Sequence, residues 1–170
     1  MSSEERGLSG AEKTCQLVTF RLGQEEFAIE ILHVQEILRL VPITPVPQAQ
    51  TYVEGVINLR GRVIPVIDLG RRLGVVGGER GRHSRIMVIT TGRQLVGVIV
   101  DGVREVLRIS TSCIEPPPPL AGGMEEECIQ GVGKLEDRLL VLLDPERLFS
   151  PSVYDPSSAQ KSGTSLLPAP

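Results

Sequence analysis

Apolar and polar residues alternate along the first part of the chain, on both sides of a Gly-Gln pair at positions 23 and 24. The apolar members of this alternation are Val18, Phe20, Leu22, Phe27, Ile29 and Ile31. Side chains two residues apart point to the same face of a strand, so the pattern predicts a hairpin with one buried face.

The next segment, residues 34–40, fits either a strand or a helical turn, because its apolar residues also recur at helical spacing. Prolines at positions 42, 45 and 47 exclude a continuing helix and indicate an extended path of the kind found at sheet edges. A short stretch around Tyr52 could form one helical turn.

Residues 55–69 read as two strands, 56–59 and 63–67, joined at Gly61. Glycine readily adopts the positive φ that a tight turn requires. Asp68 directly precedes residues 69–73, which we expect to form a short helix with Asp68 as its N-cap. A connector rich in Gly and Arg follows at residues 75–84.

The chain then repeats itself at two fixed offsets. Gly23/Gly92, Val34/Val103 and Glu36/Glu105 are each 69 positions apart (92 minus 23). A second block recurs at 76 positions (131 minus 55), and its pairs are Gly55/Gly131, Leu59/Leu135, Arg62/Arg138, Asp68/Asp144 and Arg71/Arg147. The additional residues of the second copy fit in the Pro-rich run 116–119 and in the stretch 122–127. Such a duplication favours a scaffold that binds partners over a cleft built for one reaction.

The second copy repeats the plan of the first. Its expected elements are strands at 85–90, 95–100, 129–135 and 138–143, a segment at 103–109 and a short helix at 144–149. Many short strands and few helices predict an all-β fold with a pair of small β-barrels.

The folded part is expected to span residues 15–149. Residues 1–14 are polar, and residues 150–170 are rich in Pro, Ser and small side chains, so we expect no fixed structure at either end. The repeat predicts one lobe at roughly 15–78 and the other at roughly 82–149, with exchange of strands between them left open.

Composition narrows the classes of function. The chain has 170 residues, a net charge of −3 and a pI near 5.5, which give no general attraction to nucleic acid or to an anionic membrane. Seven arginines cluster between positions 60 and 85, but few aromatic residues accompany them, so stacking on bases is not expected.

Three cysteines without C-x-x-C spacing indicate neither a disulfide framework nor a zinc site. No secretory signal or membrane-spanning run is recognisable, which favours the cytoplasm.

No catalytic constellation is recognisable either. His33 and His83 have no metal-ligand spacing around them, and the phosphate-binding glycine motifs are absent. Asp68 and Asp144 occupy equivalent positions and are the one candidate pair of catalytic carboxylates, but their place between a strand and a short helix fits N-caps better. We therefore expect no enzyme, no catalytic residue, no bound metal and no cofactor.

Glu36 and Arg60 stand out as charged residues inside apolar segments. A carboxylate and a guanidinium in such places can pair with each other or engage a partner, and composition alone does not separate these two interpretations. Exposed Ile or Val side chains beside them would complete an apolar contact patch with a polar rim.

Three segments together resemble the CheW family of bacterial chemotaxis adaptors. They are V-Q-E-I-L at residues 34–38, G-V-I-N-L-R-G-R-V-I-P-V-I-D-L at residues 55–69 and V-D-G-V-R-E-V-L at residues 100–107. The resemblance extends over residues 15–149, with the motifs in the family's order. It implies two SH3-like five-stranded β-barrels packed side by side around a shared apolar core, with short helices and no enzymatic activity.

The resemblance also implies partners. Family members couple the cytoplasmic tips of methyl-accepting chemoreceptors to the histidine kinase CheA, whose regulatory domain has the same fold. The receptor's helical hairpin would occupy the groove between the lobes. No nucleic acid would be bound, and the membrane would be reached only through the receptors. Some adaptors of this type serve motility or developmental pathways other than chemotaxis, and this alternative stays open.

Site residues follow from the same resemblance. Glu36 and Arg60 match the family's polar positions associated with receptor coupling, and Ile31 and Val34 are neighbouring apolar candidates for receptor binding. Two further residues, Ile43 and Val46, match a region implicated in kinase binding. Glu136 occupies the position of Arg60 in the second copy, so the receptor role is expected in the first.

Overall fold

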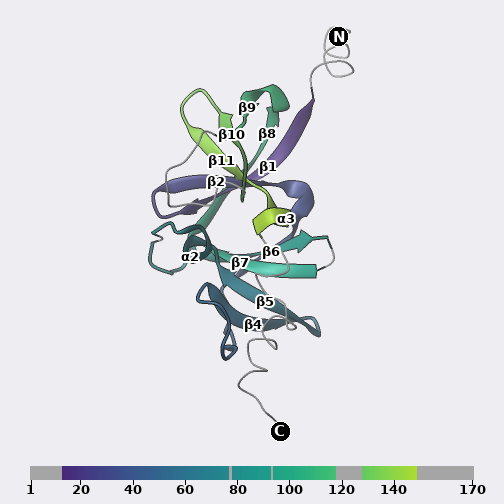
Figure 1. Ribbon diagram of the computed structural model, residues 1–170, viewed down its shortest axis with the longest axis vertical. Coiled ribbons are helices and arrows are strands. Elements are labelled where there is room, and N and C mark those ends of the chain that lie inside the picture. Colours follow the sequence, from purple (N-terminus) through teal and green to yellow (C-terminus); the bar gives the residue numbers. More distant parts are fainter. Residues whose placement is uncertain (1–12, 77, 93, 118–127, 149–170) are drawn as a thin grey trace.

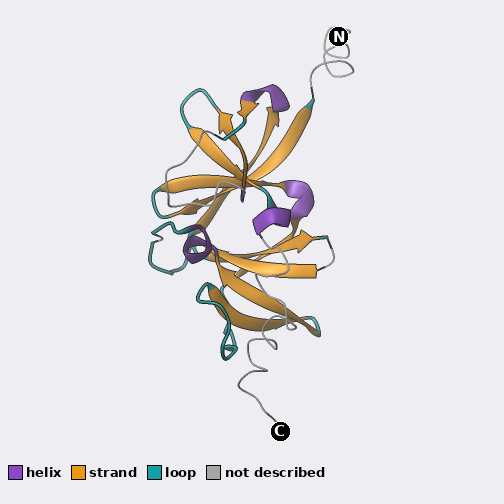
Figure 2. Ribbon diagram, viewed as in Figure 1, coloured by secondary structure: helices purple, strands orange, loops and turns teal. Residues whose placement is uncertain are grey.

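The computed structural model describes residues 13–76, 78–92, 94–117 and 128–148, which form two β-sheets stacked along the long axis of the molecule (Figure 1). The expected ends without fixed structure and most of the Pro- and Gly-rich insertion lie outside the described residues. Strands dominate and helices are short (Figure 2), which confirms the predicted all-β class.

The first sheet has the strand order β8-β1-β2-β11-β10-β9. Its strands are β1 (Thr14–Leu22), β2 (Glu25–Glu30), β8 (Gly102–Ser110), β9 (Ile114–Glu115), β10 (Ile129–Lys134) and β11 (Leu139–Leu143). The alternating residues before and after Gly23 form the antiparallel β1–β2 hairpin, with Phe20 opposite Phe27. The predicted hairpin is therefore confirmed, but the prediction of a single buried face is wrong, because Leu17, Thr19 and Ala28 on its other face are buried as well.

The second sheet has the order β3-β6-β7-β5-β4. Its strands are β3 (Val34–Arg39), β4 (Val53–Leu59), β5 (Arg62–Asp68), β6 (Arg85–Thr91) and β7 (Gln94–Val100). The ambiguous segment at 34–40 is thus a strand, because its apolar residues pair with the buried strand β6. A short 3₁₀ turn, η2 (Ile31–His33), leads from the first sheet into β3.

Each sheet curls so that the two ends of its strand order approach each other. In the second sheet β3 and β4 lie at opposite ends of the strand order, yet the segment after β3 reaches β4. There the Thr44 amide donates to the Val56 carbonyl at 2.9 Å, and the Val56 amide donates to the Thr44 carbonyl at 2.8 Å. In the first sheet β9 follows β8 through η3 (Thr111–Cys113) and pairs with β10. Both lobes therefore have the predicted small-barrel form.

The two sequence copies exchange their hairpins reciprocally. Hairpin β1–β2 of the first copy pairs with β8 and β11 of the second, and hairpin β6–β7 of the second pairs with β3 and β5 of the first. The exchange of strands that the sequence left open is therefore present, and neither sheet is built from one of the ranges 15–78 and 82–149 alone. Only η2 separates β2 from β3, and only Asp101 separates β7 from β8, so each hairpin passes directly to the other sheet.

The described part of the chain contains three apolar clusters. Two occupy the separate sheets, one around Ile57, Val66 and Val88 and the other around Leu17, Ala28 and Leu140. The third contains side chains from both sheets and from both short helices; it includes Phe20, Phe27, Leu69, Met87, Val98 and Leu148. This shared core holds the sheets together, as the side-by-side barrel prediction requires.

The two short helices α2 (Leu69–Leu73) and α3 (Pro145–Leu148) lie at the waist between the sheets (Figure 2). The Asp68 carboxylate accepts from the Arg71 amide at 3.0 Å, and the Asp144 carboxylate accepts from the Glu146 amide at 3.0 Å. Both aspartates are therefore N-caps, as predicted. The stretch around Tyr52 is a turn and not a helical turn, with the Val53 amide donating to the Gln50 carbonyl.

Candidate functional site

Edge strand β3 and the β4–β5 turn bring Glu36 and Arg60 together. The Arg60 guanidinium donates two hydrogen bonds, one to each carboxylate oxygen of Glu36, both at 2.8 Å. The Arg60 side chain is 70% exposed and that of Glu36 is 23% exposed. A bidentate pair fixes both the position and the plane of the guanidinium, so it is held in place while remaining open to a partner.

The turn that carries Arg60 has an unusual backbone. Arg60 and Gly61 are the two residues between β4 and β5, with φ of 52° and 86°. Two positive φ values match the type I′ hairpin turn, in which Asn-Gly is the preferred sequence. The Asn58 side chain accepts a hydrogen bond from the Gly61 amide at 2.8 Å and supports this turn. Arg60 thus has a left-handed backbone conformation that residues other than Gly, Asn and Asp rarely adopt.

The pair changes the acidity of both groups. The hydrogen bonds from Arg60 are the main cause of a lowered pKa at Glu36, and those same bonds raise the pKa of Arg60. A carboxyl group with a lowered pKa stays ionised further into the acid range, so the pair persists until the pH falls through that lowered pKa.

We expect NMR titration of the Glu36 side-chain carboxyl to show this directly. The Glu36 pKa should be lower in the native chain than in an Arg60→Asn variant, because the variant lacks the guanidinium. Equal Glu36 pKa values in the two proteins would contradict the pairing.

The two apolar candidates for receptor binding, Ile31 and Val34, are partly committed to the core. Ile31 in η2 and Val34 in β3 are half-buried and pack against the shared core. Their immediate neighbours are more open, since Leu32 is 88% exposed and Ile37 is 40% exposed. Sequence reasoning missed Leu32 and Ile37; the break of alternation at η2 was the available signal for Leu32.

The kinase candidates Ile43 and Val46 lie on the proline-marked segment that crosses β4. Ile43 is half-buried and packs against the second sheet's own core, and Val46 is also half-buried. The open apolar side chain on this segment is Val41. The crossing is close because Gly55 has no side chain: a Cβ there would lie 2.0 Å from the Thr44 carbonyl oxygen.

The second copy also has an ion pair at the position of the Glu36–Arg60 pair, but with a different arginine. Glu105 and Arg138, equivalent to Glu36 and Arg62, form an ion pair, and Arg138 also lies 3.6 Å from Glu26. Where the first copy has Arg60 and Gly61 at the hairpin turn, the second has Glu136 and Asp137. The two ends of the molecule therefore present turns of opposite charge, as expected from the replacement of Arg60.

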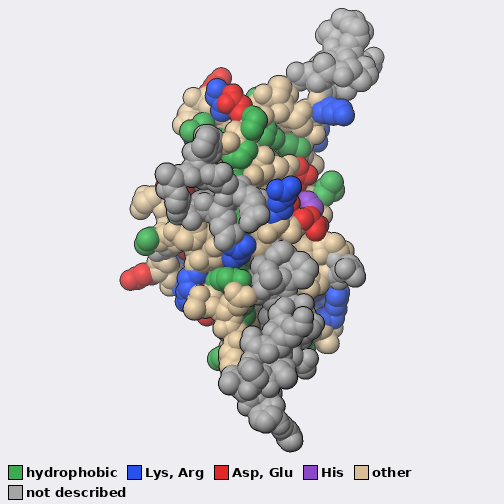
Figure 3. Space-filling view, in the orientation of Figure 1, with side chains coloured by type: hydrophobic (Ala, Val, Ile, Leu, Met, Phe, Trp, Pro, Cys, Tyr) green, Lys and Arg blue, Asp and Glu red, His purple; other side chains and the backbone are tan. Residues whose placement is uncertain are grey.

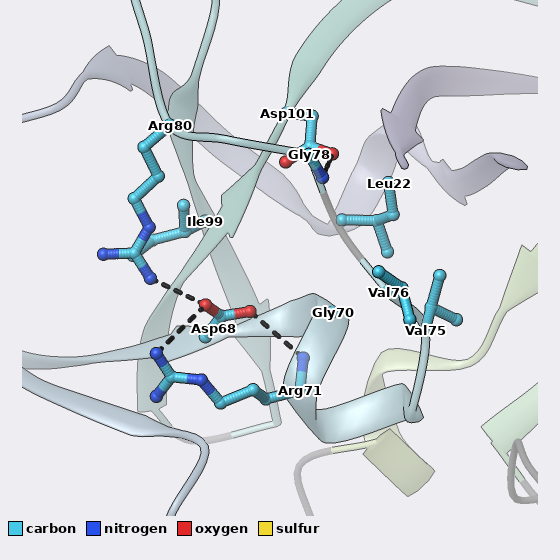
Figure 4. Close-up of a pocket in the computed structure, with 10 residues that line it drawn as sticks. All are labelled: Leu22, Asp68, Gly70, Arg71, Val75, Val76, Gly78, Arg80, Ile99 and Asp101. Carbon is cyan, nitrogen blue, oxygen red and sulfur yellow. Dashed lines mark hydrogen bonds and ion pairs between the residues drawn. The ribbon is translucent and has the colours of Figure 1, made fainter. Parts of the chain in front are cut away.

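A network of ion pairs attaches the connector between the copies to the second sheet (Figure 4). Arg80 of the connector binds both Glu54 and Asp68, at 2.9 and 2.6 Å, and Arg71 also lies within 3.7 Å of Asp68. The Asp101 carboxylate accepts from the amide of Gly78 at 2.7 Å. Asp68 thus caps α2 and pairs with two arginines, so its carboxylate is already engaged in structural contacts.

The described ranges contain no group of three His, Cys, Asp or Glu side chains arranged to hold a metal ion. In the same ranges, no helix has the length and apolar content needed to cross a bilayer. The face seen in Figure 3 mixes charges of both signs with small apolar areas.

Comparison with known proteins identifies the family. The model of the CheW-like domain matches residues 16–152. The chemotaxis protein CheW of Rhizobium meliloti is 38% identical over 134 residues, covering 79% of this chain and 86% of that protein. Protein FrzA of Myxococcus xanthus is 36% identical over 113 residues, covering 66% of this chain and 70% of that protein. The crystal structure of the scaffolding protein TtCheW from Thermoanaerobacter tengcongensis superposes with a TM-score of 0.77 at 35% identity, covering 83% of this chain and 96% of that one. The chain therefore belongs to the CheW-like domain family.

Proposed function

We propose that this chain is a non-catalytic adaptor that couples the cytoplasmic tips of methyl-accepting chemoreceptors to a CheA-type histidine kinase. The observation that supports it best is the Glu36–Arg60 pair, a charged group fixed in position yet largely open to a partner. Relatives that carry the name chemotaxis protein CheW, and a structural neighbour described as a scaffolding protein, support the same function. An adaptor of this kind works in the cytoplasm, at receptor arrays.

In this proposal the receptor tip contacts the Glu36–Arg60 pair together with Ile31 and Val34. Open Leu32 lies beside these residues and enlarges the apolar part of the contact, whereas Ile37, next to Glu36 on a regular strand, points to the other face of β3. A charged pair rimmed by aliphatic side chains suits an amphipathic helix, which presents apolar and charged side chains at fixed spacing. The kinase contacts the segment that carries Ile43 and Val46.

A second candidate is the same adaptor role in a motility or developmental pathway other than chemotaxis. The similarity to FrzA, whose name is not that of a chemotaxis protein, is the observation that favours it. The greater identity and coverage of the CheW relatives favour chemotaxis.

The function is tested by pull-down of the full chain with a CheA regulatory domain and, separately, with a receptor signalling tip from the same organism. Binding of both partners at once is the expected result. Binding of neither would overturn the proposal. Binding of a kinase and receptor from a different motility system, but not of those from the chemotaxis system, would favour the second candidate.

Arg60→Asn should separate partner binding from folding. Asn tolerates the positive φ of this position and forms the preferred Asn-Gly turn, and the lost ion pair is exposed to solvent, which weakens its contribution to folding. We therefore expect an unchanged or slightly higher melting temperature, and receptor affinity lower by about tenfold, because an arginine at the centre of a contact commonly contributes more than ~1 kcal/mol.

The matched control for this variant is Arg62→Asn, which removes an exposed arginine from the other side of the same turn. It should leave receptor affinity within about twofold of the native value. Receptor affinity that is unchanged in Arg60→Asn, or equally reduced in both variants, would contradict a specific role for Arg60.

A further inference from the structure

Strand β3 presents side chains to two opposite faces of the second sheet, and the face away from Glu36 is basic. Arg39 lies three residues beyond Glu36, with no irregularity of register between them, so the two side chains point to opposite faces. The register places Arg39 directly opposite Arg85 of β6. Opposed residues of antiparallel strands share a face, so both arginines belong to that face.

A third arginine is added by a rigid turn. The Arg85 guanidinium donates to the carbonyl oxygens of Arg82 and Ser84, at 2.7 and 2.8 Å. Buried Ser84 closes this turn, since its hydroxyl accepts from the Gly81 amide at 2.9 Å and its amide donates to the Gly81 carbonyl at 3.0 Å. The turn carries Arg82 with its side chain exposed. Arg39, Arg82 and Arg85 are referred to below as the arginine patch.

Glu79 lies exposed on the connector three residues before Arg82, and the other carboxylates close to the patch along the chain and across the sheet are already in use. Asp101 follows Val100, the residue opposite Arg85 on β7, but its carboxylate accepts from the Gly23 and Gly78 amides at 2.6 and 2.7 Å. On the connector and the second sheet, Glu54 and Asp68 are taken by Arg71 and Arg80. Among the described residues, no member of the arginine patch has an ion pair.

This local excess of positive charge contrasts with the net charge of −3 on the whole chain. Like charges directly opposite each other destabilise a sheet, so a bound carboxylate group would relieve repulsion between the two arginines. One member of the patch is already fixed by backbone carbonyls, which reduces the entropy that binding costs at that side chain.

The position of the patch indicates which partner it suits. An adaptor holds two partners at once and needs two separate surfaces, and the receptor is proposed for the opposite face of β3. Along the chain, Arg39 leads directly into the segment that carries open Val41 and the kinase candidates Ile43 and Val46. We propose that the arginine patch docks a carboxylate-rich segment of the CheA-type kinase, an inference that rests on the proposed adaptor function.

The test uses the full chain with Arg39→Glu and Arg82→Glu combined, and leaves Arg85 in place because it supports the turn. Calorimetric titration with the kinase regulatory domain should show affinity reduced by at least about tenfold at low salt, with a weaker dependence on salt concentration than in the native chain. Affinity for the receptor tip should stay within about twofold. The matched control is Arg108→Glu, the equivalent of Arg39 in the second copy, where the opposed residue is Gln16 instead of an arginine.

The outcomes separate this inference from the adaptor function. Kinase binding that is equal in the native chain and the double variant overturns the patch and leaves the adaptor function standing. Equal losses toward receptor and kinase, or an equal loss in Arg108→Glu, also overturn it. Binding of a single-stranded DNA oligomer that disappears in the double variant would assign the patch to a polyanion instead. A native chain that binds no kinase removes the adaptor function and this inference with it.

Discussion

Gly55→Ala is expected to lower the free energy of unfolding by at least about 3 kcal/mol, measured by urea denaturation. The new Cβ would lie 2.0 Å from the Thr44 carbonyl oxygen and 2.7 Å from its carbon, so backbone atoms must move. The φ of 149° is also one that alanine rarely adopts. Because Thr44 and Val56 exchange two hydrogen bonds at this crossing, the displacement would break the contact that closes the second sheet.

Gly61→Ala is the control that separates backbone strain from a steric clash of the added Cβ. Gly61 has a φ of 86°, but a Cβ there meets no atom within 4 Å. Its substitution should therefore cost only the roughly 1–2 kcal/mol of a left-handed backbone. Gly131 is the equivalent of Gly55, and a Cβ added there would lie 2.8 Å from the Glu115 carbonyl oxygen. Gly131→Ala should therefore lower stability as well. A Gly55→Ala chain as stable as Gly61→Ala would show that the crossing is not tightly fixed.

Phe27→Ala should lower stability by about 3–5 kcal/mol, the usual effect of truncating a buried phenylalanine. The Phe27 ring is fully buried in the shared core and stacks on Phe20 with the ring centroids 6.1 Å apart. Its strand also joins the two copies, since Phe27 lies opposite Val141 in the parallel pairing of β2 with β11. Thermal unfolding followed by circular dichroism would measure the loss.

Val63→Ala is the comparison for Phe27→Ala. Val63 is 67% exposed on β5, so its truncation removes little buried surface and should change stability by less than about 0.5 kcal/mol. A Phe27→Ala variant that loses less than about 1 kcal/mol would mean that the core contracts around the missing ring.

The repeat in the sequence predicted the strands, turns and short helices well, because repeated residues at equivalent positions adopt the same local backbone conformation. Strands, turns and N-caps depend on alternation, glycine and aspartate at particular positions, and these recur at the two offsets. The change of offset also located the insertion: Thr44 and Glu115 occupy equivalent pairings, opposite Val56 and Val132, and are 71 positions apart (115 minus 44). Most of the additional residues therefore come after Glu115, in the Pro- and Gly-rich stretch.

The arrangement of strands was not predictable in the same way. Alternation tells which side of a strand is buried but not which strand lies next to it, so the exchange of hairpins left no mark on the pattern. For the same reason the opposition of Arg39 and Arg85 was invisible, because it depends on the register of two distant strands. The half-burial of Ile43 likewise follows from the crossing at Gly55, a tertiary contact.

The Glu36–Arg60 contact was within reach of the sequence, since a turn residue next to Gly61 was expected to project toward a carboxylate such as Glu36. The positive φ of Arg60 itself was not expected, because the turn was assigned to Gly61 alone. A two-residue turn of type I′ needs positive φ at both positions, and arginine occupies the first of them.

The reciprocal exchange of hairpins makes the molecule a single cooperative unit. Neither sheet can come apart without removing strands from both copies, so we expect one unfolding transition in which circular dichroism and tryptic cleavage report the same midpoint. A destabilising substitution in either sheet then reduces the population of both partner surfaces together. Selective loss of one partner is therefore a diagnostic of a change at a surface, and a parallel loss of both points to the global folding equilibrium.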